Sequence, residues 1–378
     1  MLAKLFFILS FGYAKIPGQM MPFGAIIFAS DLPRIRRLIE DKMSLIMVAL
    51  SILFVVYVYI LLYFSGSGWS KEYENIFSIS YKLLIAPYLA LLLSDLILKK
   101  DNFLHYFITF QCLLIFFASF SEDIFETLLL FQTDGAIEVF SEIFGVRSVG
   151  FGLFHNEGVI AILLLYMINV TYNNKSLLYI DLLIYLSSFM SRLILFVLPF
   201  YQIYRGGYRF IFPFLVIIVA VPYFFDVSQG PASEVYEIYN NYINGNGFYL
   251  RNMDHIQTMI TIPSSFETWF YGDRMFFNID GSFYKDTDIG ILRIVYFGGL
   301  PLLFLYTMIN FLPLWFVKAN APKNIVIFII GTIILANFKG LAPHSWAALA
   351  LYHCYRPDRL LQPMPMKAVP VRLARHEI

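Results

Sequence analysis

Three arginines stand in or beside long apolar stretches of the chain. Arg192 lies within SSFMSRLILF, Arg293 lies within DTDIGILRIVYFGG, and Arg147 lies where a polar segment meets an apolar one. An arginine at membrane depth costs about 2.5–3.5 kcal/mol on insertion scales, so each marks a site unless its side chain reaches the headgroups. A planar guanidinium donates paired hydrogen bonds to phosphate oxygens and stays protonated. The three arginines therefore predict a site for a phosphorylated ligand at the membrane surface.

Other polar residues lie in the segments that would surround such a site. Asn156 and Glu157 belong to the stretch FGLFHNEG, and Lys339 and His344 flank the turn NFKGLAPH. Apart from one Asp-Thr-Asp run at 286–288, the acidic residues of these segments are scattered. A Mg²⁺ site needs clustered carboxylates. We therefore expect arginines, rather than a metal ion, to hold the phosphates.

The composition indicates that most of the chain lies in a membrane. Of its 378 residues, 59% are hydrophobic and 14% are charged, and the mean hydropathy is +0.69. Soluble domains carry roughly 25% charged residues, so these values argue against a soluble enzyme and against a disordered chain. The formal net charge of +1 provides no basic field for nucleic acid. Cys112 and Cys354 both lie in apolar stretches and predict neither a disulfide framework nor a metal site.

Apolar runs long enough to cross a bilayer predict an all-α, polytopic membrane bundle of about ten to twelve helices. Two short runs, 2–13 and 21–30, are separated by Ile-Pro-Gly and predict a tight hairpin. Residues 176–200 predict two short helices that break around Ser191. The expected spans are 43–64, 77–98, 103–120, 158–172, 176–200, 210–225, 289–309, 325–338 and 346–355.

Basic residues predict the orientation, because short loops rich in Lys and Arg stay in the cytoplasm. Residues 1–362 then form one transmembrane domain, followed by a cytoplasmic tail, 363–378. The long loop 226–288 is extracytoplasmic, and its Tyr, Asn and Gly residues suit sugar hydroxyls and stacking. We expect short helices at 234–242 and 254–260 that form a lid on the membrane. The basic residues placed on the cytoplasmic side are Arg34, Arg36, Arg37, Lys42, Lys99, Lys100, Lys175, Arg205, Arg209, Lys318, Lys323, Arg356, Arg359, Lys367, Arg372 and Arg375.

Three segments resemble the O-antigen polymerases (Wzy) of bacterial surface polysaccharide pathways and, more distantly, the O-antigen ligases. Residues 147–158, RSVGFGLFHNEG, are similar to a family stretch that begins with Arg and ends with Gly. The Ser191-Arg192 pair is similar to a Ser-Arg pair in a mid-chain span. Residues 270–273 and 287–299, FYGD and TDIGILRIVYFGG, are similar to the family segment that contains D-x-G-x-L-R. The chain departs from the family at 155–157, where His-Asn-Glu replaces Asn-Pro-Asn.

The resemblance implies a fold of the C-type glycosyltransferase kind in the bacterial inner membrane, with an active site that faces the periplasm or cell exterior. Such an enzyme moves a growing glycan from one undecaprenyl diphosphate carrier onto a lipid-linked repeat unit, and so builds O-antigen or capsule. The implied partners are the undecaprenyl-diphosphate-linked oligosaccharide, the lipid bilayer, and chain-length regulator and flippase proteins. No cofactor, metal or nucleic acid is implied.

In that reaction the three arginines stabilise the leaving diphosphate. Asp288 precedes Arg293 by five residues, so we expect it to point to the acceptor rather than to share the arginine's helical face. A base must also activate the acceptor hydroxyl, and four candidates stay open: His255, Asp288, Glu157 and His344. Further substrate contacts are expected from Asn156, Glu157, Arg274, Lys339 and His344.

Two other functions remain alternatives. An O-antigen ligase would run the same chemistry onto the lipid A core, and the late outer histidine His344 fits that enzyme. A flippase or transporter of lipid-linked oligosaccharides would instead need a central aqueous cavity with charges in both leaflets. The intramembrane charges here are biased to one side, which favours the polymerase.

Overall fold

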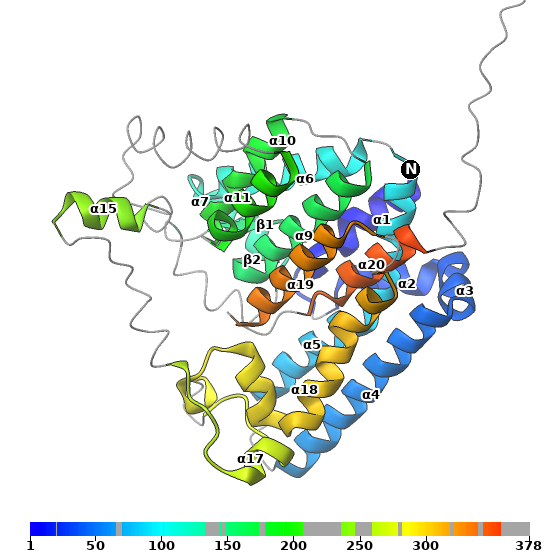
Figure 1. Cartoon of the computed structure of the whole chain (residues 1–378), viewed down its shortest axis with the longest axis vertical. Helices are drawn as coiled ribbons and strands as arrows, with labels where there is room; N and C mark the ends of the chain where they lie inside the picture. Colours follow the sequence, from blue (N-terminus) through cyan, green and yellow to red (C-terminus); the bar gives the residue numbers. More distant parts are fainter. Residues whose placement is uncertain are drawn as a thin grey trace, which may run out of the picture.

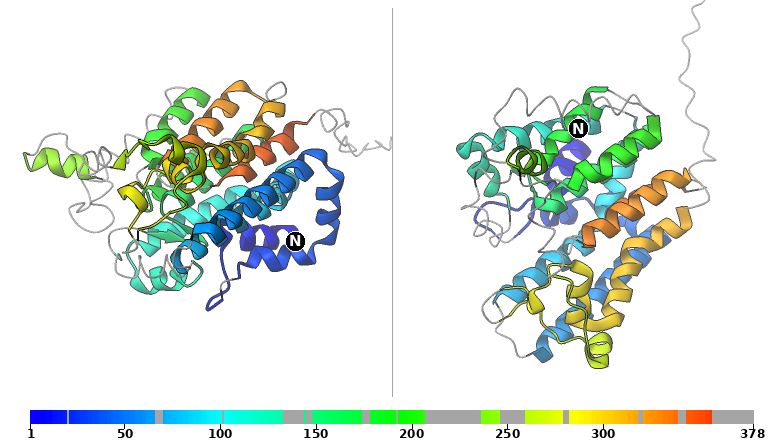
Figure 2. Two further views of the ribbon diagram at one scale, coloured as in Figure 1. Left: turned by 90° about the horizontal axis from the view of Figure 1, so that it is seen from below. Right: turned by 60° about the vertical axis from the view of Figure 1, so that its left-hand side comes forward.

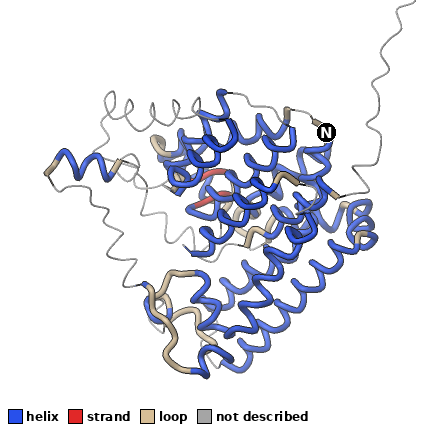
Figure 3. Tube along the Cα trace, in the orientation of Figure 1, coloured by secondary structure: helices blue, strands red, loops and turns tan. Residues whose placement is uncertain are grey.

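The computed structural model of the protein describes residues 1–19, 21–65, 70–100, 102–132, 144, 148–173, 178–191, 193–206, 236–245, 259–278, 282–317, 321–338 and 343–356. These residues are mostly helical (Figure 1). Their strands are limited to the two-residue β1 (Val149–Gly150) and β2 (Leu153–Phe154), which pair as an antiparallel hairpin (Figure 3). The predicted all-α class is confirmed for this part of the chain.

The helices named below have the following bounds: α1 Leu2–Ser10, η1 Phe11–Tyr13, α2 Phe23–Ser30, α3 Leu32–Glu40, α4 Lys42–Ser65, α5 Ser70–Leu98, α6 Phe103–Ala118, α7 Glu122–Leu129, α9 His155–Asn173, α10 Leu178–Leu183, η2 Ile184–Phe189, α11 Leu193–Gly206, α15 Glu237–Ile243, α17 Phe266–Tyr271, η5 Tyr284–Asp286, α18 Gly290–Val317, α19 Lys323–Phe338 and α20 Ser345–Tyr355.

Among the described residues, three helices are long and apolar enough to cross a membrane. They are the segments Lys42–Phe64 of α4, Ile76–Leu98 of α5 and Gly290–Val317 of α18. A helix rises 1.5 Å per residue, so the 24 residues of α4 extend about 36 Å, which exceeds the roughly 30 Å hydrocarbon core of a bilayer. The first two segments begin within one residue of the predicted spans, and α18 continues beyond its predicted end.

The other predicted spans have different outcomes. The spans 103–120, 325–338 and 346–355 correspond to the shorter apolar helices α6, α19 and α20, and 158–172 lies within α9. The span 210–225 and the tail 363–378 lie outside the described residues.

Helix α5 forms the centre of the bundle, since it packs against α4, α20, α1 and α3. Helices α9 and α20 are almost entirely buried, whereas α4 exposes one apolar side of its length. Exposed leucine, isoleucine and valine side chains along a helix of this length are typical of a lipid-facing surface. We therefore take the exposed side of α4 to face lipid; its exposed residues include Leu45, Ile46, Ile52, Leu53, Val56 and Ile60.

Two predicted irregularities are confirmed. The N-terminal runs form a hairpin, because the Ile16 amide donates to the Met21 carbonyl and the Phe23 amide donates to the Ala14 carbonyl, at 3.1 and 3.0 Å. The segment 176–200 is broken as expected, since η2 ends at Phe189 and α11 begins at Leu193.

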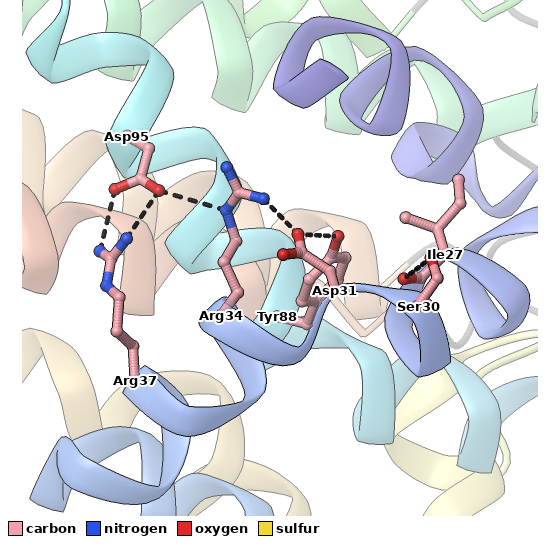
Figure 4. A network of polar contacts seen from close by, with 7 residues as sticks. All are labelled: Ile27, Ser30, Asp31, Arg34, Arg37, Tyr88 and Asp95. Carbon is pink, nitrogen blue, oxygen red and sulfur yellow. Dashed lines mark hydrogen bonds and ion pairs between the residues drawn. The ribbon is translucent and has the colours of Figure 1, made fainter.

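An arginine–aspartate network fixes α3 to the end of α5 (Figure 4). Arg37 donates two hydrogen bonds of 2.9 Å to Asp95, and Arg34 donates a third of 3.2 Å. Arg34 also pairs with Asp31, which accepts a hydrogen bond of 3.0 Å from the Tyr88 hydroxyl. These contacts place the arginines of α3 beside the end of α5, where the sequence predicts that basic residues share one side of the membrane.

The opposite ends of α4 and α18 carry residues 259–278 and 282–288 of the 226–288 loop (Figure 1 and the right-hand view of Figure 2). Here α17 packs on the first half of α18. Gly272 and Gly299 both have φ of +68°, and a Cβ atom on either would lie 2.5 Å from backbone atoms of the other segment. Only glycine allows both this conformation and this approach. The two glycines therefore fix the position of α17.

Within the 226–288 loop, α15 overlaps the predicted range 234–242 and ends one residue beyond it, which confirms a helix there. The second predicted range, 254–260, lies mostly outside the described residues. Helix α17 was not predicted.

Candidate functional site

A part-buried lysine–glutamate pair joins α5 to the first turn of α9. Lys82 Nζ lies 2.6 Å from Glu157 Oε2, and the two side chains are only 14% and 20% exposed. Burying two charges costs several kcal/mol per ion unless they pair and find further hydrogen bonds. Within the described structure, Glu157 Oε1 is buried and has no hydrogen-bond partner. This oxygen therefore has hydrogen-bonding capacity that the described residues leave unused.

Several other buried polar groups surround this pair. The Glu157 carboxylate interacts electrostatically with Tyr13, Tyr306 and His344. The Lys82 ammonium lies 5.6 Å from the centre of the Tyr13 ring. Among the described residues, the hydroxyl of Tyr13 and both ring nitrogens of His344 have no hydrogen-bond partner. Unpaired buried polar groups are unfavourable and uncommon, so their concentration here makes this cluster the candidate site. We call Tyr13, Lys82, Glu157, Tyr306 and His344 the polar cluster.

His344 is fully buried in the connection between α19 and α20. Its backbone amide donates to Asn310 Oδ1 at 3.2 Å, which fixes the residue against α18. Burial lowers the pKa of His344 to about 4, an effect larger than the opposing effect of the Glu157 carboxylate. The imidazole is therefore neutral near pH 7, because burial disfavours its protonated form.

The β1–β2 hairpin positions the start of α9. Gln111 holds it from α6: the Gln111 side-chain amide donates to the Phe151 carbonyl at 3.3 Å and accepts from the Phe151 amide at 3.1 Å. On the other side, Gly152 has φ of +67°, and a Cβ atom there would lie 2.7 Å from the Cβ atom of Ala14. This close approach brings the N-terminal turn, with Tyr13, against the segment that precedes Glu157.

Asn156 connects the start of α9 to the break between η2 and α11. Its side-chain oxygen accepts a hydrogen bond from the Ser191 hydroxyl, while its side-chain nitrogen is buried without a partner in the described structure. The Ser148 amide donates to the Phe189 carbonyl at 3.1 Å. Ser148 follows Arg147 in the sequence, and Ser191 precedes Arg192. These two serines lie on segments that meet at the start of α9. Arg147 and Arg192 themselves lie outside the described residues, as do His255 and Lys339.

Arg293 lies apart from the polar cluster. It precedes Tyr306 by 13 residues on α18, and the non-helical Gly299 lies between the two residues. Its guanidinium carbon lies 4.3, 5.5 and 5.8 Å from the ring centres of Phe283, Phe277 and Phe276.

The nearest acidic partner of Arg293 is Asp288. The distance between Arg293 Nη1 and Asp288 Oδ1 is 3.9 Å, and the arginine side chain is 8% exposed. The expectation that Asp288 points away from Arg293 is wrong, because the two side chains form an ion pair at the start of α18. Aromatic rings and a carboxylate around the guanidinium fit a structural role for Arg293, whereas its Nε is buried without a hydrogen-bond partner in the described structure, so the phosphate contact stays a prediction.

Arg274 is the remaining predicted substrate contact, and it also lies at the α17 end of the molecule. It is exposed and donates to the Phe64 carbonyl at 3.3 Å. A cavity of about 510 Å³ opens beside it; the cavity is lined by Phe64, Ser265, Glu267, Thr268, Tyr271, Gly272, Asp273 and Arg274.

The structure thus brings together Glu157 and His344, with Asn156 adjacent, and separates them from Arg293, Asp288 and Arg274. Lys82 was missed, although it stands inside the predicted span 77–98. The cost of a basic residue in a span, which identified the arginines, would have identified this lysine as well.

Among the described residues, no group of three or more His, Cys, Asp or Glu side chains could hold a metal ion. Comparisons with protein-family models, with curated proteins and with solved structures find no match to this chain.

Proposed function

We propose that this chain is a membrane glycosyltransferase: an O-antigen or capsular polysaccharide polymerase that joins undecaprenyl-diphosphate-linked repeat units. The observation that carries the proposal is the polar cluster around the Lys82–Glu157 pair. It lies at the start of α9, within the stretch 147–158 in which the sequence resembles the O-antigen polymerases.

In this proposal, Glu157 or His344 accepts the proton of the acceptor hydroxyl as that oxygen attacks the donor sugar. Both side chains have buried acceptor atoms without a hydrogen-bond partner in the described structure, so either one can accept a hydrogen bond from the acceptor hydroxyl. The bond between the donor sugar and its carrier breaks, and undecaprenyl diphosphate leaves. Lys82 and the sequence-predicted Arg147 and Arg192 supply positive charge to the diphosphate.

Under the predicted orientation, the polar cluster lies in the outer half of the membrane. Lys82 is six residues from Ile76 and sixteen from Leu98, which corresponds to about 9 and 24 Å along α5. The Leu98 end lies beside the arginines of α3, which the positive-inside rule assigns to the cytoplasm. The cluster then lies closer to the extracytoplasmic face, where lipid-linked repeat units are presented to a polymerase of the bacterial inner membrane.

Deletion of the gene in its own bacterium tests this function, because the loss of a polymerase, a ligase or a flippase leaves a different polysaccharide product in each case. Loss of a polymerase should leave single repeat units attached to the cell surface instead of a long ladder on a polysaccharide gel. Loss of a ligase would leave polymer on the lipid carrier, and loss of a flippase would leave repeat units on the cytoplasmic side. Either of these last two results would overturn the proposal.

A further inference from the structure

An exposed aromatic surface covers the end of the molecule opposite α3. Tyr63 and Phe64 end α4 with exposed fractions of 72% and 64%, and Phe266, Phe270 and Tyr271 of α17 are 72%, 40% and 66% exposed. The rings of Phe266 and Phe270 stack on each other with centres 4.3 Å apart, so this pair is ordered although it is exposed. We call these five residues the aromatic surface.

The aromatic surface is continuous with the lipid-facing side of α4. Arg274, which follows α17, donates to the carbonyl of Phe64 at 3.3 Å, and Phe64 lines the same cavity as Tyr271. The exposed apolar side of α4 therefore ends at Phe64, on the rim of a cavity that it shares with Tyr271 of α17 and that is otherwise lined mostly by polar side chains. A surface that continues a lipid-facing side of a spanning helix is expected to meet the same lipid.

The length of α4 places this surface at the height of the headgroups. Lys42 begins the helix beside the arginines of α3, and Tyr63 lies 21 residues further on, about 32 Å away. The hydrocarbon core measures about 30 Å, so Tyr63 lies where the acyl chains meet the headgroups of the second leaflet. Aromatic side chains are enriched at this depth.

The fold holds the aromatic side chains of α17 outward. On its inner side, Trp269 Nε1 donates to the Pro263 carbonyl at 2.9 Å, and the Thr268 hydroxyl donates to Asp273 at 2.7 Å. The Ser265 hydroxyl caps the helix by accepting from the Thr268 amide at 3.0 Å. Because the inner face is fixed by these bonds, Phe266 and Phe270 cannot turn into the core without unfolding the helix.

We propose that α17 is an interfacial anchor, which lies in the headgroup region of the leaflet opposite the arginine-rich α3. Its partner is the lipid surface itself. The anchor holds the cavity beside Arg274 at the surface of the membrane, whatever reaction the polar cluster carries out.

Spin labels at single introduced cysteines test this placement in the full chain, reconstituted in vesicles of phosphatidylethanolamine and phosphatidylglycerol. The native cysteines, Cys112 and Cys354, are buried and remain in place. Phe266→Cys and Phe270→Cys report on α17. Leu53→Cys on the exposed side of α4 is the deep reference, and Ser282→Cys in an exposed polar turn is the aqueous reference.

Accessibility to oxygen, which concentrates in lipid, and to a water-soluble nickel chelate gives the depth of each label. Labels at Phe266 and Phe270 should lose nickel accessibility relative to Ser282 and gain oxygen accessibility, with values between those of Ser282 and Leu53. Nickel accessibility equal to that of Ser282 would overturn the proposal. Protection from both reagents would also overturn it, since that result means that protein rather than lipid covers the surface.

Discussion

Replacing Glu157 with glutamine should abolish the long polysaccharide ladder. The substitution removes the carboxylate whose Oε1 is buried without a partner in the described structure, and a positioned general base contributes about 10²–10⁴-fold to a rate. It also leaves the part-buried Lys82 without its counter-charge, which destabilises the folded protein. The measurement is the ladder in a deletion strain that expresses the variant, together with the amount of protein in the membrane.

A double variant separates these two effects. Lys82→Met combined with Glu157→Gln removes both charges, and replacing a buried ion pair by uncharged groups is often neutral for stability. If the pair only stabilises the bundle, the double variant should restore both the protein level and the ladder. We expect it to restore the protein level alone. A normal ladder from the double variant would show that neither charge takes part in the reaction.

Replacing Arg293 with alanine should destabilise the loop at the α17 end rather than stop the chemistry. The guanidinium contacts three phenylalanine rings and pairs with Asp288, and desolvated cation–π contacts contribute about 2 kcal/mol. Its removal should increase protease cleavage between residues 259 and 289 and lower the protein level. Arg293→Lys should recover only part of this loss, because an ammonium lacks the planar face that stacks on the rings.

The matched control is Arg36→Ala, since Arg36 is 83% exposed and pairs only with Glu40 one turn away in α3. It should leave cleavage and protein level unchanged. An Arg293→Ala protein that resists protease as well as the wild type but makes no polymer would contradict the structural role. That result would instead support the phosphate contact expected from the sequence.

Apolar length was sufficient to predict the long helices. The spans of α4 and α5 begin within one residue of the expected positions, because about 20 uncharged residues leave the chain few alternatives in a membrane. Local polarity also predicted where helices break, at Ser191 and in the N-terminal hairpin. Helix α17 was not predicted, because a helix of six residues is too short to show a helical period of apolar residues. Ser265, which accepts a hydrogen bond from the Thr268 amide, was the available signal for the start of this helix.

The candidate site could be predicted only in part, because its charges come from distant elements. Asn156, Glu157 and His344 stood out through their positions near the ends of apolar segments, and the structure places Glu157 and His344 in one cluster. Their partner Lys82 is 75 residues from Glu157, and no local pattern encodes such a contact. Arg293 carried the same sequence signal as a phosphate-binding arginine, but its partners are phenylalanines and an aspartate supplied by the preceding loop.

The transfer of a glycan between two lipid carriers at the polar cluster is tested most directly by reconstitution. Purified protein in vesicles is given undecaprenyl-diphosphate-linked repeat units isolated from the deletion strain, and both polymer length and released carrier are measured. We predict that repeat units join, with one undecaprenyl diphosphate released for each new glycosidic bond, and that the Lys82→Met/Glu157→Gln protein forms no bond. Movement of repeat units across the bilayer without bond formation, or bond formation by the double variant at the wild-type rate, would contradict this assignment.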